Sequence, residues 1–117
     1  MSSPKEVVEA YLDCIRKRDL SDAPFTHDVL FQDPLSVEPI RGPNHVARFI
    51  QAYLPVVNDV KVIRHIADGN YVATLWRCDT TYGKLTLFQY FLIEDGKIAE
   101  LRSFFDPRTV LENMGNR

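Results

Sequence analysis

A single carboxylate, Asp33, ends a short apolar segment and is followed at once by Pro34. In residues 29–33 apolar side chains alternate with others, which is typical of a half-buried strand. Proline cannot donate to a strand ladder, and it restricts the residue before it to extended geometry. A carboxylate held there against an apolar interior has a raised pKa and can act as a general base. The alternative is that Asp33 only begins a turn, because Asp before Pro is common in turns.

A tyrosine in the first predicted helix is the second candidate. Ser3 suits the N-cap of this helix and Pro4 its first position. Apolar residues then recur at helical spacing up to Ile15. Tyr11 lies on this apolar stripe, so we expect its ring in the core and its hydroxyl on a hydrogen-bond partner.

An Arg–Asp pair in the predicted strand 71–80 is the third candidate. Arg77 and Asp79 share one face of this strand, and Trp76 and Cys78 share the other. Hydrophobicity does not decide which face points inward. If Arg77 and Asp79 point inward, they form a buried ion pair that can polarise a ligand. If they point outward, they lie in a dimer interface or in water, which the pattern slightly favours.

The overall composition narrows the function classes. The chain has 117 residues, which predicts one domain over 1–117. The net charge is -2 with no basic run, which argues against a nucleic-acid partner. No segment has the apolar length of a membrane span or of a signal peptide, and the two cysteines have no metal or redox spacing. We therefore expect a cytoplasmic protein. The three histidines share no spacing and no phosphate-binding glycine motif occurs, so we expect no metal and no cofactor.

The elements that must position these residues follow from periodicity and turn residues. We expect helices over 4–18 and 46–54, a strand over 29–33 and a loop over 34–43. Four strands follow at 60–67, 71–80, 85–93 and 98–105, joined by tight turns, and a last helical turn covers 109–116. This order predicts an α+β domain, in which a curled antiparallel sheet is closed by two to three helices. A concave sheet of this kind leaves room for a small-molecule site.

The last two strands supply further residues for that space. Alternation places Leu87 and Gln89 on one face of strand 85–93. On the next strand the apolar-rich row, with Leu101, Ser103 and Phe105, is expected to face the same interior. These side chains are the predicted pocket lining for a small apolar ligand.

The other face of strand 85–93 is apolar as well. It carries Phe88, Tyr90 and Leu92. One helical layer covers only one face of a sheet, so the outer face needs another cover, and a second subunit is the simplest one. We therefore predict a homodimer through the outer sheet face.

With this order of elements, the chain resembles the nuclear transport factor 2-like superfamily, which has a cystatin-like, cone-shaped fold. Within it the chain is similar to the ketosteroid isomerase-like and SnoaL-like proteins (small polyketide cyclases). The resemblance covers nearly the whole chain and rests on the opening helix with Tyr11, on residues 31–34 and 40–42, on the helix 46–54 and on the ending 94–98. These motifs identify the fold better than the reaction, because the fold hosts unrelated chemistries.

The resemblance implies roles for three residues. Asp33 falls on the general base of ketosteroid isomerase, and Tyr11 falls on or beside the tyrosine that donates to the forming enolate oxygen. Gln89 stands at the position of the second donor, a protonated aspartate in that enzyme. An amide donates a weaker hydrogen bond than a carboxylic acid.

A second, partial similarity is to limonene epoxide hydrolase, through residues 76–79 and 102–106. Arg77 and Asp79 match the Arg-x-Asp pair of that family. Ser103 stands where the family has a further aspartate, and Asp33 stands where it has an amide.

Three hypotheses result. The first is an isomerase or lyase acting on a small apolar carbonyl compound, steroid- or polyketide-like, with Asp33 as the base and with Tyr11 and Gln89 stabilising the enolate. The second is a non-catalytic small-ligand-binding or dimerisation module. The third is an epoxide hydrolase or polyketide cyclase-like enzyme using Arg77 and Asp79. The first requires Asp33 to face the interior without an arginine partner, and the third requires both members of the Arg–Asp pair to face it.

Overall fold

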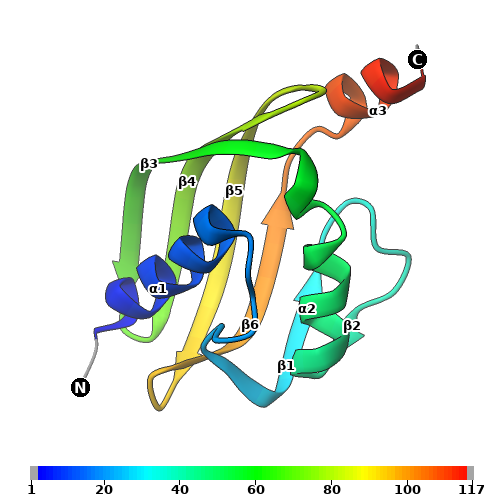
Figure 1. Cartoon of the computed structure of the whole chain (residues 1–117). Helices are drawn as coiled ribbons and strands as arrows, with labels where there is room; N and C mark the ends of the chain where they lie inside the picture. Colours follow the sequence, from blue (N-terminus) through cyan, green and yellow to red (C-terminus); the bar gives the residue numbers. More distant parts are fainter. Residues whose placement is uncertain (1–2, 116–117) are drawn as a thin grey trace.

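The structure, a computed structural model, describes residues 3–115, which form one sheet with helices packed on it (Figure 1). Its elements in chain order are α1 (Pro4–Lys17), β1 (Phe25–Gln32), β2 (Ile40–Arg41), α2 (Pro43–Gln51), the 3₁₀ turn η1 (Leu54–Val56), β3 (Val57–Asp68), β4 (Tyr71–Thr80), β5 (Gly83–Glu94), β6 (Lys97–Phe104) and α3 (Arg108–Gly115). The predicted α+β class is confirmed.

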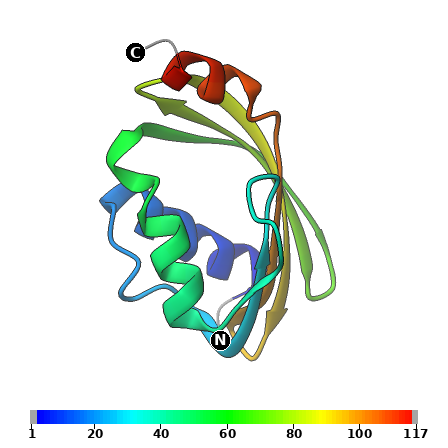
Figure 2. The ribbon, with the colours of Figure 1, turned by 90° about the vertical axis from the view of Figure 1, so that its right-hand side faces the viewer.

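The sheet has six strands in the order β2-β1-β6-β5-β4-β3. Strands β3 to β6 form consecutive antiparallel hairpins, as the turn residues predict. Strand β1, however, pairs parallel with β6, with Phe31 beside Leu101 and Gln32 beside Arg102. The sheet is therefore mixed and not purely antiparallel, because the long connection through α2 and three hairpins brings the chain back beside its first strand. The sheet curls without closing into a barrel (Figure 2).

Three local predictions were wrong. Strand β1 begins at Phe25, four residues before the predicted start at residue 29, and Phe25 pairs with Ile98. The two residues of β2 lie inside the loop predicted over 34–43, because they pair with Leu30 and Phe31. Helix α2 ends at Gln51, before Pro55, which lies in η1. The predicted last turn over 109–116 corresponds to α3, although residue 116 lies outside the described part.

Helix α1 begins and packs as the sequence predicts. The Ser3 hydroxyl accepts from the Glu6 N–H at 3.3 Å, and the Glu6 carboxylate accepts from the Ser3 N–H at 3.0 Å. This capping box satisfies two backbone donors that the helix itself leaves free. The predicted apolar stripe is buried: Val7, Val8, Tyr11, Leu12 and Ile15.

The helices are placed unequally around the sheet. Helices α1 and α2 lie on its concave side, and α3 lies at one end, next to β5 (Figure 2). Within residues 3–115, none of the helices has the length and apolar character needed to cross a membrane. The concave face of the sheet therefore shares its space with α1, α2 and η1, and this space holds the candidate site.

Candidate functional site

A cavity of about 460 Å³ lies between the concave face of the sheet and the helices. We call it the central cavity. Six of the predicted site residues line it: Tyr11, Asp33, Leu87, Gln89, Ser103 and Phe105. The remaining lining is mostly apolar and includes Ile15, Phe31, Phe49, Ile50, Tyr53, Leu54, Trp76 and Leu85. A cavity of this volume and character suits a small apolar ligand.

Three other predicted lining residues lie elsewhere. Trp76 and Cys78 occupy the inward row of β4, so Arg77 and Asp79 point to the outer face. There the Arg77 Nε lies 4.0 Å from the Asp79 Oδ1 in a partly exposed ion pair. The epoxide hydrolase hypothesis required both residues in the central cavity, and the alternation of the strand excludes this. Leu101 faces inward but is packed completely in the core, so it does not line the cavity.

Asp33 reaches the central cavity because it follows β1 directly. Its neighbour Gln32 points outward and accepts a hydrogen bond from Arg102, so the next side chain points inward. Gln32 pairs with Arg102 across two adjacent strands. The residues that follow them, Asp33 and Ser103, therefore lie at the same level of the sheet. The polar end of the site is thus assembled from two segments that are 70 residues apart in sequence.

The Asp33 carboxylate takes part in a turn and also lines the central cavity. Its Oδ1 accepts from the N–H groups of Leu35 and Ser36, each at 2.8 Å, which fixes the turn after the strand. The half-buried carboxyl group also lines the cavity. Burial raises the pKa of Asp33 above the ordinary value, although the hydrogen bonds of the turn act in the opposite direction. Among the described residues no arginine or lysine forms an ion pair with it, so the condition for a general base is met.

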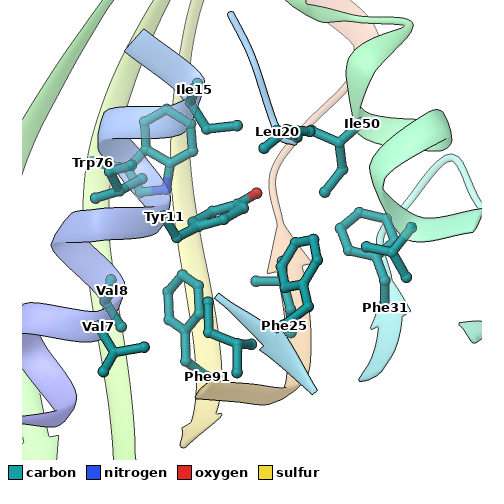
Figure 3. Packing of buried hydrophobic residues seen from close by; sticks show 14 of the residues in the cluster. Val7, Val8, Tyr11, Ile15, Leu20, Phe25, Phe31, Ile50, Trp76 and Phe91 are labelled. Carbon is teal, nitrogen blue, oxygen red and sulfur yellow. The ribbon is translucent and has the colours of Figure 1, made fainter. Parts of the chain in front are cut away.

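Tyr11 lies at the junction of the core and the cavity. Its ring packs against Phe25 and Phe91, with centroids 5.9 and 5.8 Å apart. Figure 3 shows its hydroxyl oxygen pointing away from Val7 and Val8. Burial raises the pKa of Tyr11 strongly, so the hydroxyl keeps its proton, and the charge of Asp33 adds to this effect. A hydrogen bond with Gln89 lowers the same pKa, so the Gln89 side chain lies beside the tyrosine hydroxyl.

Gln89 is held between two further residues. The indole Nε1 of Trp76 donates to the Gln89 Oε1 at 2.8 Å, and the Gln89 Nε2 donates to the Ser103 Oγ at 2.7 Å. The prediction that Gln89 faces inward is confirmed. The sequence did not indicate Trp76 as its partner, because the pattern did not decide which face of β4 points inward.

Sequence reasoning also missed Tyr53 as a cavity residue. Tyr53 follows α2, stacks edge-on against Phe49, and lines the cavity near the end of β1. Burial raises the pKa of its hydroxyl, and Asp33 contributes to this shift. The helical spacing of Phe49 and Tyr53 was the available signal for this pair.

The assembled site can carry out proton transfer. It offers a carboxylate with a raised pKa, a protonated tyrosine and a buried serine hydroxyl around one apolar space. Within residues 3–115, His, Cys, Asp and Glu side chains do not gather in the groups of three that could hold a metal ion. A carboxylate beside neutral hydroxyl donors has the chemistry that general acid–base catalysis and the binding of a carbonyl group require.

Comparisons with known proteins agree with this fold. The family model described as a domain of unknown function (DUF4904) matches residues 2–116. A search of curated proteins found no match. A protein from Kribbella flavida has a similar structure, with a TM-score of 0.87 and 17% identity over 96% of this chain and 93% of that chain.

Two further solved structures bear on the superfamily. A steroid delta-isomerase from Pseudomonas aeruginosa has a TM-score of 0.78 and 23% identity, over 100% of this chain and 92% of that one. An NTF2-like protein of unknown function from Cytophaga hutchinsonii has a TM-score of 0.79 and 15% identity, over 95% and 96% of the two chains. At such identities the likeness shows the fold alone. The chain belongs to the family described as a domain of unknown function (DUF4904), and its fold is that of the nuclear transport factor 2-like superfamily.

Proposed function

We propose that the chain is an isomerase or lyase that moves a proton next to the carbonyl group of a small apolar compound, of steroid- or polyketide-like character. One observation carries this proposal. The half-buried Asp33, with a raised pKa and no ion-pair partner among the described residues, lines the same apolar cavity as Tyr11. The steroid delta-isomerase named above shares the fold, which supports the proposal by analogy.

The reaction follows from the chemistry of these groups. The Asp33 carboxylate takes a proton from the carbon next to the carbonyl, and the C–H electron pair forms the double bond of an enolate. The carbonyl oxygen gains negative charge, and the Tyr11 hydroxyl donates to it. The hydrogen bond with Gln89 helps to hold Tyr11 in this position. The proton then returns to another carbon in an isomerase, or a leaving group departs in a lyase. Apolar walls strengthen each of these interactions because water is excluded.

The alternative is a non-catalytic ligand-binding module. Its support is the turn, because Asp33 Oδ1 is engaged by two backbone N–H groups and has a structural role without any catalysis. Both functions use the central cavity and the same ligand class. They differ in whether bound carbonyl compounds exchange their α-hydrogens.

A homodimer through the outer sheet face accompanies both functions. Phe88 and Phe104 lie opposite each other on β5 and β6, and they are 45% and 57% exposed. Leu75 lies beside Phe88 on β4, so the apolar area is continuous across three strands. Four strands about ten residues long present a face of roughly 20 by 30 Å. Its area approaches the roughly 800 Å² per partner of a standard interface, which favours a second copy of the chain as its cover.

Deuterium exchange tests the catalytic proposal. The purified protein is incubated in D₂O with 2-tetralone or 2-acetonaphthone, and α-hydrogen exchange is followed by NMR. We expect Asp33→Asn to slow the exchange by about 10²–10⁴-fold, and Tyr11→Phe to slow it by about 10²–10³-fold. Tyr71→Phe is the matched control, since it removes a tyrosine hydroxyl that lies outside the cavity and should leave the exchange unchanged. Binding of these ketones with equal exchange in wild type and Asp33→Asn would refute the base and leave the binding module.

A further inference from the structure

Three buried side chains form one hydrogen-bonded chain in the wall of the central cavity. Gln89 lies directly opposite Ser103 on β6 and opposite Thr74 on β4, so Trp76 is its diagonal neighbour. The bonds measure 2.8 Å from Trp76 to Gln89 and 2.7 Å from Gln89 to Ser103. The three residues are 4%, 3% and 5% exposed. Water therefore does not compete for these bonds, and each bond keeps a defined donor and acceptor.

The indole of Trp76 sets that direction. An indole N–H can donate but cannot accept, so the Gln89 atom that faces it must be the amide oxygen. The amide nitrogen then faces Ser103, and the Ser103 oxygen accepts. A serine hydroxyl carries a single hydrogen, and this bond does not use it. Because Ser103 lines the cavity, its hydrogen is available to a ligand.

A second hydroxyl group, that of Tyr11, lines the same cavity. Burial keeps its proton on the oxygen, so this hydroxyl is also available as a donor.

We propose that Ser103 and Tyr11 together bind one ligand oxygen that only accepts hydrogen bonds, either a ketone carbonyl or the enolate oxygen formed from it. Ser103 is the second donor of the site, and Gln89 and Trp76 act through it as positioning residues. The ligand class and the role of Tyr11 rest on the proposed function, whereas the Ser103 donor rests on the direction of the hydrogen bonds.

Loss of the indole N–H has a specific consequence. Trp76→Phe removes the N–H group that holds the Gln89 oxygen toward β4, so the amide can turn and present its oxygen to Ser103. The serine then donates to Gln89 and no longer to the ligand. A residue that does not reach the ligand oxygen thereby controls one of its two hydrogen bonds.

The test uses 2-acetonaphthone labelled with ¹³C at the carbonyl carbon, whose resonance moves downfield when the oxygen accepts hydrogen bonds. We expect Ser103→Ala and Trp76→Phe to move the bound resonance upfield from its wild-type position. Each variant also raises the Kd about 10-fold, which corresponds to one hydrogen bond. Ser103→Thr keeps a hydroxyl and restores the resonance. Leu87→Val is the matched control for volume, because it shortens an apolar lining side chain that makes no hydrogen bond.

The outcomes separate this proposal from the proposed function. An unchanged carbonyl resonance in Ser103→Ala would overturn the second donor. A shift in Ser103→Ala without one in Trp76→Phe would overturn the positioning role. Failure of the wild type to bind the ketone would overturn the proposal as a whole. A downfield resonance without α-hydrogen exchange would remove the catalysis and leave the two donors in place.

Discussion

Removing the two exposed phenylalanines of the outer sheet face tests the homodimer most directly. The exposed surface areas of Phe88 and Phe104 add up to about the area of one fully exposed phenylalanine, or roughly 200 Å² in each protomer. At about 25 cal/mol per Å², burying this surface contributes at most about 5 kcal/mol for each protomer. Serine retains part of the contact, so we expect Phe88→Ser with Phe104→Ser to raise the dimer dissociation constant at least about 100-fold.

Sedimentation equilibrium over a range of micromolar concentrations measures this constant. Val37→Ser is the matched control, because Val37 is 99% exposed on a loop away from the sheet and should leave the constant unchanged. Both phenylalanines point away from the core, so the double variant should keep the wild-type circular dichroism spectrum. A wild type that is monomeric at tens of micromolar, or a double variant that dimerises as tightly as wild type, would refute the reasoning.

Two further predictions concern stability. Because burial raises the pKa of Asp33, the folded protein holds this proton more tightly than the unfolded chain, and stability falls as the pH rises from the ordinary carboxyl range through the raised pKa. Asp33→Asn keeps an oxygen for the turn and removes the charge. In thermal denaturation its Tm should therefore exceed the wild-type Tm by more at pH 7 than at pH 3, and equal differences at the two pH values would contradict the raised pKa of Asp33. Ser3→Ala breaks the capping box of α1 and should lower the free energy of unfolding by about 1 kcal/mol in urea titrations, whereas an unchanged value would show that the cap contributes nothing.

Local patterns in the sequence predicted most of the fold. The helical spacing of the first segment and the capping residues Ser3 and Pro4 predicted α1, because both signals lie within a few turns of one helix. The turn residues between strands predicted three hairpins for the same reason. Alternation also placed Ser103 on the apolar-rich row of its strand and Gln89 on the row of Leu87, and both rows face inward.

The partners of the site residues depended on pairing between distant strands. The parallel pairing of β1 with β6, which brings Asp33 beside Ser103, joins segments 70 residues apart and leaves no local signal. The inward face of β4 was undecided because both of its rows mix apolar and polar residues, and the packing of Trp76 against Gln89 decided it. The sequence by itself determined the elements and the identity of the candidate base. The tertiary structure alone decided which side chains surround that base, because hydrogen bonds across a sheet depend on strand register and not on spacing along the chain.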